Sequence, residues 1–260
     1  MLKKSNCLLL VISYFVWAIL SCPITYAWSD QAHMAIARAA GLRGFHNACA
    51  PDVSRLVMKI NRFEQTAGKS HFFNTDRVIT RQDVYDQILI LKHHKNMDKG
   101  YILGAIIETM RCAKATTESN HQDDYSYAIL AHYVGDLTQP LHIYPYNEFN
   151  KKNHLTADNT LEDKDVVWEI DGAIRISREL RINDNLRFKN EEEVIDHLVT
   201  LANESYELAK DMEKNNRLLT RKEAIERVSK AASFMRAIMI YCGKNSGHSR
   251  GDSEPMKKTL

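Results

Sequence analysis

The sequence predicts an all-α protein built as a single multi-helix domain. Apolar residues recur at intervals of three and four along most of the chain, and the period-two alternation typical of strands is scarce. The composition is 44% hydrophobic and 26% charged with only five prolines, which excludes collagen-like and disordered classes. No repeat or composition break divides the chain, so one domain is expected over residues 28–246.

The first element is a secretory signal peptide over residues 1–27. It has two lysines near its start, an apolar stretch of thirteen residues from Leu8 to Leu20, and a small residue, Ala27, at its end. Thirteen apolar residues fall short of the roughly 20 that span a bilayer. We therefore expect a secreted or periplasmic protein; an uncleaved anchor and a lipoprotein cut before Cys22 are the alternatives. Removal of the two lysines changes the net charge from +2 to zero.

The periodic segments that follow predict helices over residues 31–41, 52–65, 81–94, 99–114, 123–137, 165–180, 191–213 and 221–242. Thr80 and Thr220 are N-cap candidates, because an acidic residue follows each in the first turn. Segments 66–80 and 143–164 are expected to be loops, and the polar tail 247–260 is expected to be disordered. Trp168 is interpreted as an anchor that packs over the core.

Three cysteines follow the leader, at Cys49, Cys112 and Cys242. Because the number is odd, one disulfide with one free thiol and three reduced thiols both stay open. No C-x-x-C spacing occurs, so a zinc–thiolate site is not expected.

Histidines and aspartates form two pairs that suit a metal ion. His132 and Asp136 are four residues apart on a predicted helix, so both side chains leave the same face. His154 and Asp158 repeat this spacing, and His142 follows the helix-ending proline between the pairs. A single helical histidine is most often a core residue, but imidazole and carboxylate ligands in this pattern indicate Zn²⁺ with positions open to water.

The stretch His132 to His142 reads H-x-x-G-D-x-x-Q-P-x-H. It resembles the signature of the zinc-dependent phospholipase C and S1/P1 nuclease superfamily, whose members are all-helical secreted phosphodiesterases with three zinc ions. The resemblance implies a fold of that type, three bound Zn²⁺, and hydrolysis of phosphoester bonds by metal-activated water.

Members of that superfamily begin with a tryptophan whose α-amine and carbonyl oxygen bind zinc, and Trp28 follows the expected cleavage site. The resemblance implies a first zinc held by Trp28, His33 and Asp136. It implies a second zinc held by Asp136, His71, His132 and an aspartate that precedes His71. It implies a third zinc held by His142, His154 and Asp158.

The preceding aspartate is matched best by Asp52, because Asp52 and Arg55 resemble the nuclease D-x-x-R element. There the carboxylate binds metal and orients the attacking water, and the arginine stabilises the transition state. The distance of nineteen residues from Asp52 to His71 is long for the family, so Asn61 and Glu64 stay open as alternatives.

The nuclease branch is favoured over the phospholipase branch by the short spacing from Trp28 to His33. In a nuclease Phe72 is expected to stack on a base and Asn74 to hydrogen-bond its edge. The substrates are then single-stranded DNA or RNA and 3′-nucleotides, with no stable protein partner. The twelve-residue step from His142 to His154 instead favours a phospholipase C acting on phospholipid head groups. A catalytically silent, zinc-binding secreted protein is the third reading.

Overall fold

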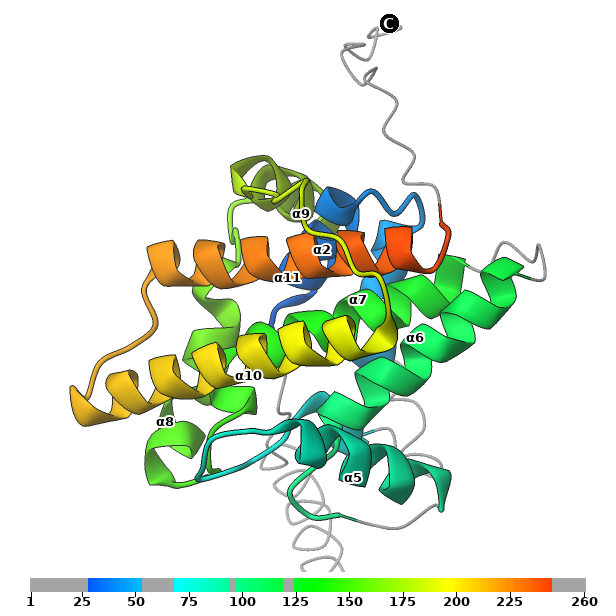
Figure 1. The fold of residues 1–260 in the computed structure, drawn as a ribbon. Coiled ribbons are helices and arrows are strands. Elements are labelled where there is room, and N and C mark those ends of the chain that lie inside the picture. The colour runs from blue at the N-terminus through cyan, green and yellow to red at the C-terminus, as the bar shows by residue number, and fades with distance from the viewer. Residues whose placement is uncertain (1–27, 53–67, 94–96, 119–123, 245–260) are drawn as a thin grey trace, which may run out of the picture.

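The computed structural model describes residues 28–52, 68–93, 97–118 and 124–244, and these residues fold into helices without any strand (Figure 1). The expectation of an all-α protein is confirmed for this part of the chain. The α-helices are α2 (Asp30–Ala40), α5 (Arg81–Lys92), α6 (Ile102–Glu118), α7 (Asp124–Thr138), α8 (Glu148–Asp158), α9 (Glu169–Glu179), α10 (Glu191–Lys214) and α11 (Arg221–Tyr241). Short 3₁₀ helices are η1 (Phe45–Cys49), η2 (Gly68–His71), η3 (Pro140–His142) and η4 (Asn159–Leu161).

The expected loop over residues 143–164 is only partly correct, because α8 and η4 lie inside it. Its asparagines, which suggest a loop, include the residue that starts the helix: the Asn147 side chain accepts a hydrogen bond from the Asn150 N–H at 3.0 Å. The other expected helices each overlap an observed one, except the helix over 52–65, of which residues 53–65 lie outside the described residues.

The two expected N-caps are confirmed as capping boxes. The Thr80 N–H and hydroxyl donate to the Asp83 carboxylate at 2.8 and 2.9 Å. The Thr220 N–H and hydroxyl donate to Glu223 at 3.0 and 2.7 Å, and the Glu223 N–H donates back to Thr220 at 3.3 Å. Both helices therefore begin where the local sequence alone specifies.

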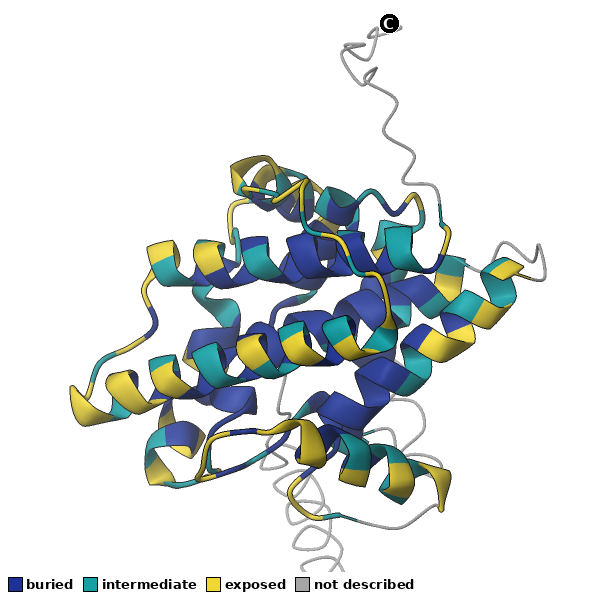
Figure 2. Cartoon of the chain, viewed as in Figure 1, coloured by how far each residue is buried: buried dark blue, intermediate teal, exposed yellow. Residues whose placement is uncertain are grey.

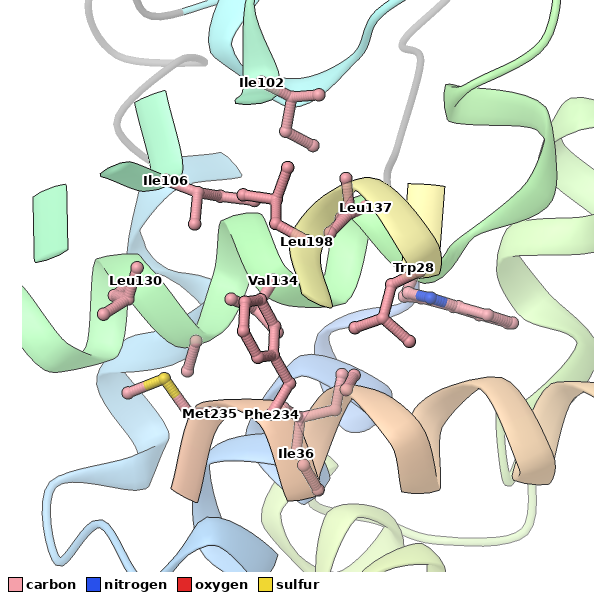
Figure 3. Close-up of a cluster of buried hydrophobic side chains, with 14 of the residues drawn as sticks. Trp28, Ile36, Ile102, Ile106, Leu130, Val134, Leu137, Leu198, Phe234 and Met235 are labelled. Carbon is pink, nitrogen blue, oxygen red and sulfur yellow. The ribbon is translucent and has the colours of Figure 1, made fainter. Parts of the chain in front are cut away.

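The core lies between α2, α6, α7, α10 and α11. Helices α10 and α11 run antiparallel, with α7 and α2 behind them (Figure 1). Figure 3 shows Trp28 and side chains from these five helices converging, and every labelled one is buried. Buried positions run along α7 and the middle of α11, whereas exposed positions gather on the outer faces of α5 and α10 (Figure 2). Helix α7, which carries the H-x-x-G-D pattern, is therefore a central element of the fold.

A buried arginine holds the C-terminal end of α7. The Arg227 guanidinium, only 4% exposed, donates to the carbonyl of Thr138 at 3.2 Å and to that of Leu201 at 2.8 Å. Its charge is balanced by Glu204 at 2.6 Å. Because the end of a helix carries unpaired carbonyls and a partial negative charge, this cation stabilises the end of α7 that leads into η3.

The expectation that Trp168 anchors the core is wrong, because its side chain is 71% exposed. Trp168 is the N-cap of α9 and precedes the stripe that packs on α2, which consists of Gly172, Ala173 and Ile176. A Cβ on Gly172 would lie 2.1 Å from Oε1 of Gln31, so a larger residue there would have to displace the Gln31 amide. Two apolar neighbours of Trp168 are also exposed: Val167, before α9, is 86% exposed, and Ile170, in its first turn, is 44% exposed.

Cys49, Cys112 and Cys242 are all free, so of the two open readings the structure supports three reduced thiols. Among the helices described, none combines the length and the apolar character needed to span a membrane.

Candidate metal centre

The fold gathers eight of the expected ligands from distant parts of the chain, all less than a tenth exposed. Helix α7 supplies two of them, α8 supplies two, and α2, η2 and η3 supply one each. The eighth, Asp52, lies in a helical turn directly before the undescribed segment 53–67. The eight residues are His33, Asp52, His71, His132, Asp136, His142, His154 and Asp158.

The first cluster surrounds Asp136 on α7. An Asp136 carboxylate oxygen lies 2.9 Å from Nδ1 of His71 and 3.3 Å from Nε2 of His132. The same two ring nitrogens lie 3.1 Å from each other. The i, i+4 spacing places His132 and Asp136 on one face as expected, and η2 brings His71 against them.

Asp52 completes this cluster. Its carboxylate oxygens lie 3.9 Å from Nδ1 of His71 and 3.8 Å from Nε2 of His132. Asp52 thus lies beside His71 and His132 in spite of the long sequence spacing. Arg55 and the alternatives Asn61 and Glu64 lie outside the described residues.

His33 meets Asp136 from the opposite side, with Nε2 3.3 Å from the other carboxylate oxygen. Its ring stacks on that of His132 with centroids 3.8 Å apart. A Cβ on Gly135 would lie 2.7 Å from Nδ1 of His33, so the glycine of the H-x-x-G-D pattern lets α2 approach α7. Trp28 precedes this helix, and its indole is buried in the core (Figure 3).

The second cluster joins η3 to α8. Nε2 of His142 lies 3.9 Å from one Asp158 oxygen, and Nε2 of His154 lies 3.7 Å from the other. Gln139 donates a hydrogen bond from its amide to Asp158. The Ser29 N–H donates to the Asp158 carbonyl at 3.1 Å, which places the start of the described chain beside this cluster.

The hydrogen-bond partners of this second cluster determine which ring nitrogens carry protons. Asn150 donates from its amide nitrogen to three main-chain carbonyls, so its oxygen must accept from Nδ1 of His154 at 2.7 Å. The carbonyl of His71 likewise can only accept from Nδ1 of His142, at 2.5 Å. In the neutral rings both Nε2 atoms are therefore acceptors.

These two acceptor nitrogens face each other at 3.2 Å. Two lone pairs at that distance repel unless a cation lies between them, either a proton shared by His142 and His154 or a metal ion. His132 shows the same arrangement, since its Nδ1 is 2.8 Å from the Ala48 carbonyl and its Nε2 faces the carboxylates. Donation of the second ring nitrogen to an oxygen is the usual environment of a metal-binding histidine.

The spacing of the donor nitrogens suits a tetrahedral metal ion. Two nitrogens that bind a tetrahedral zinc at 2.0–2.1 Å lie about 3.3 Å apart, close to the observed 3.1 and 3.2 Å. Three groups of ligand atoms lie within 4.8 Å of one another: His33, Asp52 and His132; His71, His132 and Asp136; and His142, His154 and Asp158. Nε2 of His33 and the Asp136 oxygen that it faces have no hydrogen-bond partner among the described residues, as expected of ligand atoms. The residues present therefore fit metal binding.

Burial and neighbouring charges shift the pKa values of the first cluster. Burial lowers the pKa of His33 to about 4, and the charge of His132 adds to this. Burial also opposes protonation of His132, but the charges of Asp136 and Asp52 outweigh it and raise its pKa to about 9. Burial opposes ionisation of Asp136, yet the adjacent histidines hold its pKa well below the ordinary value. These shifts favour an Asp136 carboxylate beside a protonated His132.

The expected base-binding residues follow His71. The Phe72 ring is half-buried against Gly100, where a Cβ would lie 2.5 Å from the ring. The Asn74 N–H donates to the Lys99 carbonyl at 2.7 Å. Phe72 and Asn74 therefore lie on a segment that packs against residues 97–100, next in the chain to a ligand of the centre.

The residues that orient the ligands were not singled out as site residues from the sequence. Gln139, Asn150 and the carbonyl of Ala48 hold Asp158, His154 and His132 respectively. Asn150 lies one helical turn before His154, and that spacing is the one local signal for its role. The carbonyl of Ala48 has no sequence signal, because every residue carries a carbonyl.

No family model, no curated protein and no solved structure matches this chain.

Proposed function

We propose that this protein is a metal-dependent phosphoester hydrolase with the phospholipase C/P1 nuclease type of fold, secreted or periplasmic after leader removal. The observation that carries the proposal is the pair of Nε2 atoms of His142 and His154, which face each other at 3.2 Å while both Nδ1 atoms donate. A shared proton or a bound metal ion would relieve the repulsion between them, and a buried Asp158 carboxylate lies beside them. Together with the cluster around Asp136, this gives a centre suited to three Zn²⁺.

The ligand assignment follows the resemblance. Trp28, His33 and Asp136 would hold one ion, His71, His132, Asp52 and Asp136 a second, and His142, His154 and Asp158 a third. When bound, zinc supplies the Lewis acidity that polarises a phosphate ester and favours deprotonation of a water molecule.

The chain's own residues would position the reactants. The buried Asp52 carboxylate, within 4 Å of two histidines, would orient a water molecule and accept its proton. Arg55, three residues later, would stabilise negative charge on the phosphate. His132 and His154 keep fixed orientations because their Nδ1–H groups donate to Ala48 and Asn150.

Single-stranded nucleic acid and 3′-nucleotides are the substrates we favour. The supporting observation is that Asp52 of the nuclease-like D-x-x-R element lies at the centre. Phospholipid is the second candidate, and it is favoured by the exposed apolar side chains of Val167 and Trp168.

To test this, the zinc-loaded protein is incubated with single-stranded DNA, RNA, a 3′-mononucleotide and phosphatidylcholine, each with and without a chelator, and hydrolysis is measured. Asp136→Asn should abolish turnover, whereas Asp171→Asn, at an exposed carboxylate of α9, should retain it. If the protein binds zinc but shows no chelator-sensitive hydrolysis of any phosphoester, it is a catalytically silent zinc-binding protein and the proposal is refuted.

A further inference from the structure

Three large apolar side chains protrude from the chain between α8 and α9. Val167, Trp168 and Ile170 are 86%, 71% and 44% exposed, and we name them the apolar knob. No other stretch of four residues in the described part of the chain exposes three large apolar side chains. Single exposed apolar residues are ordinary on protein surfaces, but a contiguous group marks an interaction site.

The backbone before the knob is held in place by Gln31 of α2. The Gln31 amide donates to the Asp163 carbonyl at 3.1 Å and accepts from the Asp163 N–H at 2.8 Å. The Asp163 carboxylate accepts from Arg175 at 2.7 Å. The Gln31 amide thus both donates to and accepts from the main chain of Asp163. This pair of hydrogen bonds holds the backbone before the knob against α2.

The backbone after the knob is fixed by α9. The Asp171 N–H donates to the Trp168 carbonyl at 2.9 Å, and Gly172 packs directly on Gln31. Three side chains that would be more stable in a core are thus presented to solvent by a hydrogen-bonded support.

The support connects the knob to the metal centre. Gln31 lies two residues before His33 on α2. Helix α9, which begins within the knob, packs on the same helix α2. The support of the knob therefore shares a helix with one of the ligands of the metal centre.

The charges around the knob select the kind of partner. Residues 162–171 contain five acidic side chains and one basic one, Lys164, and Arg175 of α9 pairs with Asp163, so an acidic excess of three remains. This excess repels nucleic acid, an anionic membrane, and a second copy of the same surface. It attracts the quaternary ammonium of a choline head group, which aromatic faces also bind.

The size of the knob also favours a lipid surface. A stable protein interface needs about 800 Å² on each partner, more than three side chains provide. A bilayer needs no complementary pocket, and tryptophan is the side chain that prefers its interface. We propose that the apolar knob docks the protein on a zwitterionic lipid surface, with Trp168 in the head-group region of a phosphatidylcholine bilayer. This docking goes beyond phosphoester hydrolysis and requires no turnover.

The test is binding of the chain that starts at Trp28 to phosphatidylcholine vesicles with a chelator present, so that docking and hydrolysis are measured separately. The difference between the emission spectra of the wild type and Trp168→Phe reports Trp168, and it should shift to shorter wavelength on binding. Partition into vesicles should fall about tenfold or more when Val167, Trp168 and Ile170 are all replaced by serine. Replacement of Val78 and Leu218 by serine, also at exposed apolar positions, should leave partition unchanged.

Exchange of phosphatidylcholine for an anionic lipid should weaken binding by the wild type. The inference is overturned if the serine variant partitions like the wild type, or if anionic lipid strengthens binding that depends on the knob. It is also overturned if single-stranded DNA quenches Trp168 emission while phosphatidylcholine leaves it unchanged, or if the knob variants alter only the oligomeric state. Circular dichroism of the serine variant establishes that it is folded, and Trp168→Phe gives a milder change at the same position.

Discussion

Replacement of Asp136 by Asn in the metal-free protein should destabilise it in a strongly pH-dependent way. Asp136 is fully buried and is the largest favourable influence on the charged form of His132. The amide keeps the size of the side chain but removes its charge, so the imidazolium of His132 loses its nearest counter-ion. The buried His132 should then be neutral at pH 7.

The magnitude follows from the pKa of His132, which rises from 6.5 to about 9 on folding. At about 1.4 kcal/mol for each pKa unit, this rise corresponds to about 3 kcal/mol. Because the folded-state pKa is raised, this stabilisation is fully present below pH 6.5 and is lost as the pH rises through about 9. The cost of Asp136→Asn should therefore be about 3 kcal/mol larger at pH 6 than at pH 9.5.

The assay is urea-induced unfolding of chelator-treated wild type and variant at pH 6 and at pH 9.5. Asp171→Asn on exposed α9 is the matched control and should change the free energy of unfolding by less than about 0.5 kcal/mol at either pH. An equal cost of Asp136→Asn at both pH values would refute the reasoning, because His132 would then carry no charge that Asp136 stabilises.

Four further outcomes are expected. Zinc binding at pH 7 should release the proton held by His132, seen by calorimetry in buffers of different ionisation enthalpy; heats that are independent of the buffer would contradict this. A chain with one glycine before an amino-terminal Trp28 should hold fewer zinc ions by elemental analysis than a chain that starts at Trp28, and equal zinc content would exclude the α-amine as a ligand. Gly172→Ala should destabilise the fold by about 1–3 kcal/mol in urea, because its Cβ meets the Gln31 side chain; an unchanged midpoint would show that Gln31 moves aside freely. Arg227→Met should cost about 3 kcal/mol in the same assay, whereas Arg221→Met, at an exposed ion pair, should cost less than about 1 kcal/mol, and equal costs would contradict a special role for the buried arginine.

The helices and the two i, i+4 pairs were predictable because both depend on local geometry. Thr80 and Thr220 start helices through side chains within the same turn. His132 and Asp136 share a face for the same reason, whichever way the helix packs. Helix α8 was missed as an element because its polar, asparagine-rich sequence lacks a strong apolar stripe, although the spacing of His154 and Asp158 already suited a helix.

The assembly of the centre was not predictable from spacing. Asp52 and His71 are nineteen residues apart, and no local rule says that their side chains approach within 3.9 Å. The positions of His33 and His71 depend on how α2 and η2 pack against α7, since contacts between distant segments are made only in the folded chain. The expected ligands came from the family resemblance, whereas the distances between their donor atoms are known only from the structure.

The sequence by itself determined the all-α class, the helix starts and the chemistry of the donors, because these depend on side-chain type and on spacing along a few turns. Only the tertiary structure decided that Gly135 lets α2 approach α7, that Asn150 turns His154 toward His142, and that Trp168 faces solvent. The surroundings of each of these three residues depend on which helix packs against it, and that is decided by the packing of segments far apart in the sequence.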